Sequence, residues 1–327
     1  MDTEVYVQVT AFDKNSNDEF GRSINADTKE SFNQQVEEFE SMIPFTKYYI
    51  TMVSDDVLTP EQESIIEDYE VDWNIMEYKS IAQAKRVTGL SYLGMVNNST
   101  KHEKAYKYDE HVYTIYLAPA KMSGYEVCPM RTKECTKLCI HESGRNRIDV
   151  RENRINKSRI KKTKLFFEHR EFFMKWLVDD ITNAQKKAKD LGYHFSVRLN
   201  NTSDLSPESF YLDVDGVKKN ILQIFPDVQF YDYSKVYKRA ELVKKYKNYD
   251  VTFSYSGSNL QDCISMLNNN VRVAVVFKEV PEKFWGRKVI NGDLYDMRYR
   301  DDKDVIVGLK FKKVRNKLVD TNKFVIQ

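Results

Sequence analysis

The sequence lacks the features that would assign it to a membrane or to several familiar enzyme classes. It has no apolar run of the roughly eighteen residues that a membrane-spanning helix needs. Its first residues carry no basic segment followed by an apolar one, so we expect no signal peptide and a cytoplasmic protein. It contains no G-x-x-x-x-G-K-[ST], H-E-x-x-H or G-x-S-x-G motif. P-loop nucleotide hydrolases, zinc proteases and α/β-hydrolases are therefore disfavoured.

Cysteine is scarce, but three of the four cysteines are close together, at Cys128, Cys135 and Cys139. A reducing cytosol does not favour disulfides, and three converging thiolates suit a soft metal centre, zinc or an iron–sulfur cluster. The alternative is that one or two of them are buried as small hydrophobic side chains. Basic residues interleave with the cysteines, which makes this segment a poor core candidate and favours the metal.

Two further residues were considered as metal ligands. His141 follows Cys139 and would complete a Cys3His zinc site, although a histidine so placed more often lies on the loop surface. Cys263 falls in an expected amphipathic helix, where a core position is the simpler interpretation.

Charge is distributed unevenly along the chain. Residues 1–120 contain 22 acidic and 10 basic residues, and the remainder contains 27 acidic and 41 basic ones. The basic part is expected to meet an anion such as nucleic acid or a nucleotide phosphate, or else to complement the acidic part.

A basic segment at residues 144–164 is expected to be helical. Arg147, Arg151, Arg154 and Lys161 share one face of that helix by their spacing. Phosphates are natural counterions for such a stripe, so these residues are predicted nucleic-acid contacts. The alternatives are a solvated face or a face docked on the acidic part.

Hydrophobic patterning predicts two domains. Residues 1–100 form a small acidic α/β domain, with strands at 4–12, 48–53 and 72–77 and helices at 28–39 and from Thr59. Residues 97–104 are polar and predict a linker or exposed loop. Residues 108–327 then alternate strands with helices, including helical stretches at 149–189 and 207–222. Strands are expected at 112–117, 194–199, 228–233, 251–255, 271–277 and 305–310.

Repeated βα units predict a parallel sheet, either open or a partial barrel, with ligands at the carboxyl ends of its strands. Short polar residues follow several of these strands, next to the cysteine segment. They predict a ligand pocket lined by Asn200, Asn201, Asp204, Tyr231, Asp232, Ser256 and Ser258.

The cysteine pattern after the first strand resembles the phage "gene product 88" family and, more distantly, phage proteins of radical-SAM type. The similarity extends through residues 198–204, 230–235, 289–293 and 305–310 and covers roughly residues 110–315. The distant relation implies a partial (βα)6 TIM-like barrel behind the small N-terminal domain. It also implies a [4Fe–4S] cluster on the three cysteines, with S-adenosylmethionine bound to the fourth iron. This chain departs from the usual C-x3-C-x2-C spacing of that type, and Asn200-Asn201-Thr202 replaces its glycine-rich segment after strand two.

Three functions are compatible with these observations. The first is a phage-type iron–sulfur protein, radical-SAM-like, that acts on or binds nucleic acid or nucleotides in the host cytoplasm. The alternative is a non-catalytic, zinc-stabilised module that binds nucleic acid or a host protein. The third is a metal-free phage accessory protein that interferes with a host factor through its acidic domain. The sequence does not indicate an oligomeric state.

Overall fold

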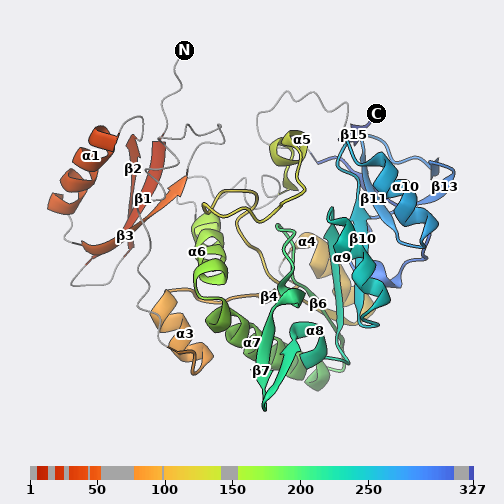
Figure 1. Ribbon diagram of the computed structural model, residues 1–327, viewed down its shortest axis with the longest axis horizontal. Helices are drawn as coiled ribbons and strands as arrows, with labels where there is room; N and C mark the ends of the chain where they lie inside the picture. The colour runs from red at the N-terminus through yellow and green to blue at the C-terminus, as the bar shows by residue number, and fades with distance from the viewer. Residues whose placement is uncertain are drawn as a thin grey trace. The chain divides into compact units, whose positions relative to one another are not determined.

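The chain forms two compact units. The computed structural model describes residues 6–13, 19–25, 29–42, 45–52, 77–97, 99–140, 154–312 and 324–327. One unit comprises residues 1–76 and 121–125, and the other comprises residues 77–120 and 126–327. Figure 1 shows the elements of each unit.

The first unit contains an antiparallel sheet in the order β2-β1-β3, with β1 (Tyr6–Asp13) between β2 (Glu19–Asn25) and β3 (Phe45–Met52). The helix α1 (Lys29–Met42) buries Phe32 and Phe39, which lie on one helical face because seven residues make two turns. The strands predicted at 4–12 and 48–53 and the helix predicted at 28–39 are confirmed, whereas β2 was not predicted. The helix predicted from Thr59 and, apart from Glu77, the strand predicted at 72–77 lie outside the described residues.

The second unit is built on a sheet whose central six strands are parallel. They are β5 (Glu110–Thr114), β6 (His194–Arg198), β9 (Gln229–Ser234), β10 (Tyr249–Ser254), β11 (Val273–Phe277) and β14 (Ile306–Lys310). They lie side by side in the order in which they occur along the chain. All six correspond to strands predicted from the sequence.

Shorter strands extend this sheet at its sides. They are β4 (Met95–Val96) beside β5, β13 (Arg287–Asn291) beside β14, β12 (Lys283–Phe284) beside β13, and β15 (Val325–Ile326) beside β11. Within the described part of the chain β5 does not pair with β14, so the sheet is open. The α/β class is therefore confirmed, whereas a TIM-like barrel is not: the strands keep the consecutive order of a partial barrel without closing.

Helices and 3-10 turns connect the strands. They are α3 (Ile81–Thr88), α4 (Thr100–Glu103), η1 (Lys104–Tyr108), α5 (Lys133–Lys137), α6 (Arg154–Glu168), α7 (Arg170–Asp190), η4 (Pro207–Ser209), α8 (Ile221–Ile224), α9 (Tyr237–Glu241), η5 (Leu242–Lys244), α10 (Leu260–Asn268) and η6 (Arg298–Arg300). In the described part of the helical stretch predicted at 149–189, a break at His169 separates α6 from α7.

Two predicted connections differ from the structure. Most of the stretch predicted as helical at 207–222 is a hairpin of β7 (Tyr211–Val214) and β8 (Val217–Asn220). Its turn places Asp215 and Gly216 at positive φ, which an Asp-Gly pair accommodates well. The linker predicted at 97–104 is also wrong for His102 and Asn97, which are buried.

The two faces of the parallel sheet bury different partners. Tyr113 of β5 donates a hydrogen bond to Asp180 of α7 at 3.0 Å, so this face is covered by helix. The next residue back, Val112, packs with Tyr231 and Met297 on the opposite face. This alternation is the period-2 geometry of a strand, and it gives β5 one face toward α7 and an opposite face toward Tyr231 and Met297.

Candidate functional site

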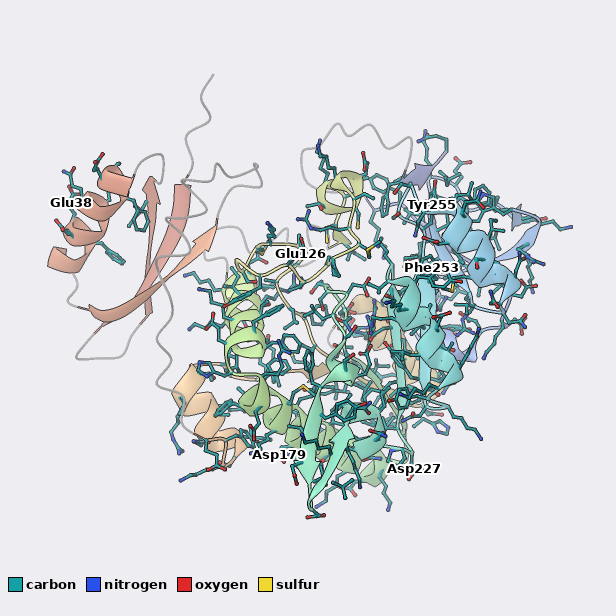
Figure 2. The ribbon with its side chains drawn as sticks, in the orientation of Figure 1. Glu38, Glu126, Asp179, Asp227, Phe253 and Tyr255 are labelled. Atoms are coloured by element: carbon teal, nitrogen blue, oxygen red, sulfur yellow. The ribbon has the colours of Figure 1, made fainter. Side chains whose placement is uncertain are left out.

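Residues 126–140, here called the cysteine loop, have a backbone that is held by their own polar side chains. Figure 2 labels Glu126, the first residue of this loop. Its carboxylate accepts a hydrogen bond from the Cys128 N–H at 2.8 Å and pairs with the Arg131 guanidinium at 2.9 Å. Arg131 also donates to the Thr136 hydroxyl at 2.8 Å. The segment that carries the cysteines is therefore an ordered loop.

Thr132 joins this loop to the end of β10. Its hydroxyl oxygen accepts a hydrogen bond from the Cys135 N–H at 3.1 Å and thereby caps the short helix α5. The same hydroxyl donates to the backbone oxygen of Ser256 at 3.1 Å. Cys135 is thus fixed over the carboxyl end of β10.

A second set of contacts joins the loop to the end of β6. The Asp204 N–H donates to the Val127 carbonyl at 2.7 Å, and the Cys128 thiol lies 3.9 Å from the Thr202 carbonyl. The Thr202 hydroxyl in turn donates to the Leu117 carbonyl at 2.6 Å. The prediction that the strand ends meet beside the cysteine segment is confirmed.

Lys235, at the end of β9, is the charged group common to all three cysteines. Burial alone would lower the pKa of its ammonium, but Cys135, Asp204, Cys128 and Cys139 act on it and raise that pKa. Burial raises the pKa of the Cys128 thiol to about 12, an effect that Lys235 opposes. Without a further positive charge, Cys128 is therefore a neutral thiol at pH 7.

The donor set is right for a soft metal, but its geometry is not that of a formed site. The three thiols share one loop and one ammonium neighbour. Within the described residues, however, no group of three His, Cys, Asp or Glu side chains is placed to hold a metal ion. Metal binding at the cysteines would therefore require α5 and the loop to draw the sulfurs together.

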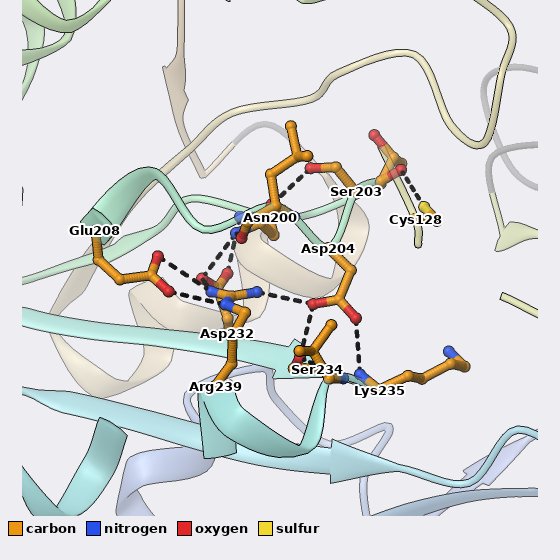
Figure 3. Close-up of polar contacts among 12 residues, drawn as sticks. Cys128, Asn200, Ser203, Asp204, Glu208, Asp232, Ser234, Lys235 and Arg239 are labelled. Carbon is orange, nitrogen blue, oxygen red and sulfur yellow. Dashed lines mark hydrogen bonds and ion pairs between the residues drawn. The ribbon is translucent and has the colours of Figure 1, made fainter. Parts of the chain in front are cut away.

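A buried network around Arg239 occupies the next position along the same edge (Figure 3). Its guanidinium pairs with Asp204 at 2.8 Å, Glu208 at 2.9 Å and Asp232 at 3.0 Å. The Tyr249 hydroxyl also contacts it. The positive charge of Arg239 offsets the repulsion among these three buried carboxylates, so they depend on its presence.

Three predicted pocket residues belong to this network. Asn200 donates to Asp232 through its backbone N–H at 2.8 Å and through its side chain at 3.1 Å. Asp204 accepts from the Ser234 hydroxyl at 2.7 Å and from the Lys235 N–H at 2.7 Å. Asn200, Asp204 and Asp232 therefore have partners within the protein. Asp204 also positions the backbone of Lys235.

Tyr231, also predicted to line the pocket, belongs to a different cluster on the opposite face. Its hydroxyl lies 3.2 Å from the fully buried Asp296 carboxylate, which also binds Arg198 at 2.7 Å, Lys101 at 3.0 Å and His102 at 2.9 Å. Burial alone would raise the pKa of Asp296, but Arg198 and Lys101 more than offset this and hold the pKa well below its usual range.

The cations around Asp296 share an aromatic neighbour. Lys101 and Arg198 both lie over the Tyr233 ring, at 5.6 Å and 4.7 Å from its centroid. The Tyr233 hydroxyl is buried and has no hydrogen-bond partner among the described residues. This combination of cations, an aromatic ring and an unsatisfied hydroxyl suits an anionic ligand with a ring.

The remaining predicted pocket residues lie near the cysteine loop. Ser256 is buried, and its hydroxyl is 3.4 Å from that of Ser258. Asn201 follows β6, and its side-chain nitrogen is buried without a hydrogen-bond partner in the part of the chain that is described. These three residues are brought to the carboxyl edge with the cysteines.

Of the four basic residues predicted to contact nucleic acid, the structure describes the side chain of Lys161 alone, and its position differs from the prediction. Arg147 and Arg151 lie outside the described residues, and nothing is described of the side chain of Arg154, the first residue of α6. Lys161 is buried, so it does not lie on an exposed face. Arg159 and Lys162 are also buried, beside the rings of Tyr116 and Tyr92.

Of the two remaining cysteine and histidine candidates, only Cys263 is described. It is fully buried in α10, and burial raises the pKa of its thiol to about 12. This agrees with the prediction of a core position. His141 lies outside the described residues.

Sequence reasoning missed four charged residues that the structure singles out: Lys235, Arg239, Asp296 and Arg159. Lys235 was identifiable as the first basic residue after a predicted strand. Arg239 and Asp296 have no such local signal, because each has a partner far away in the chain: Glu208 is 31 residues from Arg239, and Arg198 is 98 residues from Asp296. Arg159 lies within the basic segment at residues 144–164 but outside the face that is predicted to contact phosphate.

The fold and the site define an open α/β protein with a cysteine loop over the carboxyl edge of a parallel sheet. The family model described as Gene product 88 matches residues 90–326. The chain therefore belongs to the Gene product 88 family, a phage protein family, and the match covers nearly the whole second unit.

Other comparisons add no relative. No curated protein and no solved structure matches the chain. Among the described residues, no helix has the length and apolar character required to cross a membrane.

Proposed function

We propose that the protein is a phage metal protein that holds an iron–sulfur cluster on Cys128, Cys135 and Cys139 and acts on or binds a nucleotide or nucleic acid beside it. The observation that carries the proposal is the docking of the cysteine loop on the carboxyl edge of the sheet, through Asp204 after β6 and Ser256 after β10. Ligands of open α/β sheets bind at this edge.

The surroundings of the thiols support a metal over a cysteine nucleophile. A nucleophilic cysteine needs a depressed pKa, whereas burial raises the pKa of Cys128. A metal ion would stabilise the buried thiolate by taking the place of the thiol proton. A bound [4Fe–4S] cluster would supply an iron with an open coordination position and one-electron chemistry, as used with S-adenosylmethionine.

The nucleotide part of the proposal is supported by the other side chains near this edge. Arg198 and Lys101 place two cations over the Tyr233 ring, and Arg198 is the last residue of β6. Cations and aromatic rings together suit phosphate and base. These residues would bind and orient a ligand next to the cysteine loop, and the loop would shield it from water.

Metal analysis after anaerobic, iron-replete purification tests the proposal. We expect brown protein with about four irons per chain, as a cubane cluster requires. Replacing any one of Cys128, Cys135 or Cys139 with Ser should remove most of the iron, because the cluster needs its full thiolate set. Cys263→Ser is the matched control and should keep the iron.

The alternative outcomes separate the two metals. Colourless protein with one zinc per chain would replace the cluster with a structural zinc site and support a binding module. Protein that holds neither metal under these conditions would contradict both forms of the proposal.

A further inference from the structure

We propose that Arg159 and Lys162, on the inner side of α6, form a binding site for the terminal phosphate of a nucleotide. The two residues are three positions apart, so they project from the same side of the helix. The inference rests on the nucleotide part of the function proposed above.

Both basic side chains are buried, and the described residues supply neither with an ion-pairing carboxylate. Arg159 is 8% exposed and Lys162 is 3% exposed. The Nη1 atom of Arg159 is buried and has no hydrogen-bond partner in the described residues, and neither side chain forms an ion pair with a described carboxylate. Burying a cation without a partner costs free energy. Binding of an anion here would offset part of that cost.

An aromatic ring, and no ion-paired carboxylate of the described residues, lies beside Arg159. Its guanidinium lies 5.2 Å from the centroid of the Tyr116 ring, and the other groups that act on its pKa are Cys139 and Tyr92. An arginine with unused donors beside an aromatic ring is well suited to a phosphate oxygen.

Asp180, the carboxylate that acts on the pKa of Lys162, accepts hydrogen bonds from other residues. Asp180 acts on the pKa of Lys162 through space, but its oxygens accept from the Tyr113 hydroxyl at 3.0 Å and the Trp176 Nε1–H at 3.2 Å. Lys85, which acts on Asp180, adds positive charge on that side. Asp180 acts on Lys162 through space and forms no ion pair with it among the described residues.

Lys162 lies beside a side chain that reaches the surface. The Lys162 ammonium lies 4.0 Å from the centroid of the Tyr92 ring, and Tyr92 is 41% exposed. A terminal phosphate reaches two recessed donors end-on, whereas a continuous nucleic-acid backbone lies along a surface. The recessed position therefore favours a mononucleotide.

The protonation of the pair agrees with this arrangement. Burial lowers the pKa of Arg159, and burial together with Arg159 lowers the pKa of Lys162 to about 7. A bound phosphate would raise the pKa of Lys162 again, because a nearby negative charge favours the protonated amine.

Calorimetric titration of the purified full-length chain at low salt tests the inference. AMP should bind, and adenosine should bind at least about tenfold more weakly, because it lacks the phosphate. Arg159→Met and Lys162→Met keep the aliphatic stems and should each weaken AMP binding by at least about tenfold. Lys157→Met on the same helix is the control and should leave binding within about twofold.

A second readout separates lost binding from lost folding. Lys162→Met removes a buried, unpaired charge, so its melting temperature without ligand should rise. A melting temperature that fell together with AMP binding would overturn the inference, since Lys162 would then be a structural residue.

The remaining outcomes distinguish this inference from the proposed function. If AMP bound wild type and both α6 variants equally, the inference would fail and the nucleotide function would stand. If inorganic phosphate, AMP and a single-stranded oligonucleotide all failed to bind wild type, both would fail. If only the oligonucleotide bound and the variants weakened it, the terminal-phosphate assignment would be wrong.

Discussion

The Arg239 network and the Arg159–Lys162 pair are both buried near the carboxyl edge, yet their charges are arranged in opposite ways. Arg239 has three carboxylate partners within 3.0 Å. Arg159 and Lys162 have no carboxylate partner among the described residues. Arg239 and its carboxylates stabilise the fold, whereas Arg159 and Lys162 are the groups that we propose bind a ligand. The predicted pocket residues Asp204 and Asp232 belong to the first kind.

The largest effect is expected from removing the centre of the balanced network. Arg239→Met would leave Asp204, Glu208 and Asp232 buried together without their cation. We expect a loss of about 3–5 kcal/mol in the free energy of unfolding, measured by chemical denaturation. Lys238→Met, at an exposed position of the same helix, is the control and should change stability little. Similar stability of the two variants would show that Arg239 does not support the fold.

Removing the charge of Lys162 should increase the free energy of unfolding, in contrast to the loss expected for Arg239→Met. The pKa of Lys162, about 7, lies below the ordinary lysine value of 10.5, so between these values the unfolded chain binds more protons than the folded one. The burial penalty is therefore fully present below pH 7 and is relieved as the pH rises toward 10.5.

Lys162→Met should be more stable than wild type by about 2 kcal/mol below pH 7, and this advantage should shrink as the pH rises. Urea denaturation of both proteins at pH 6 and pH 9.5 measures the difference. An advantage that does not depend on pH would contradict a lowered lysine pKa.

A smaller effect is expected where the cysteine loop meets the sheet. Thr132→Val removes the cap of α5 and the hydrogen bond to Ser256. It should cost about 1 kcal/mol in unfolding free energy and lower metal content by loosening the loop. Thr182→Val, at an exposed position of α7, is the matched control. Unchanged metal content in Thr132→Val would mean that docking of the loop on β10 does not support the metal centre.

The sequence predicted the elements whose signal is local. Six apolar runs predicted the six central parallel strands, because buried parallel strands are nearly continuous in hydrophobic residues. The position of the cysteine loop followed from the same reasoning, since the carboxyl ends of parallel strands share one edge. The β7–β8 hairpin was missed although Asp215-Gly216 is a turn signal within the sequence.

What could not be predicted depends on contacts between distant residues. Asn200, Asp204 and Asp232 look like ligand residues in the sequence. In the structure Arg239 pairs with the two carboxylates, and Asn200 donates a hydrogen bond to Asp232. The orientation of α6 is likewise set by its packing, with the Thr163 hydroxyl donating to the Arg159 carbonyl and accepting from the Ala118 N–H. Periodicity identified a basic face but not the direction in which that face points.

Asp204 also makes the opening of the cysteine loop separately observable. Its backbone N–H is bonded to the loop at Val127, while its carboxylate accepts the backbone N–H of Lys235 within the Arg239 network. Local opening of the loop breaks the first bond and leaves the second, so the two amide protons should exchange with solvent at different rates. The exchange of the Asp204 amide would report movement of the loop, and that of Lys235 would report disruption of the buried network beneath it.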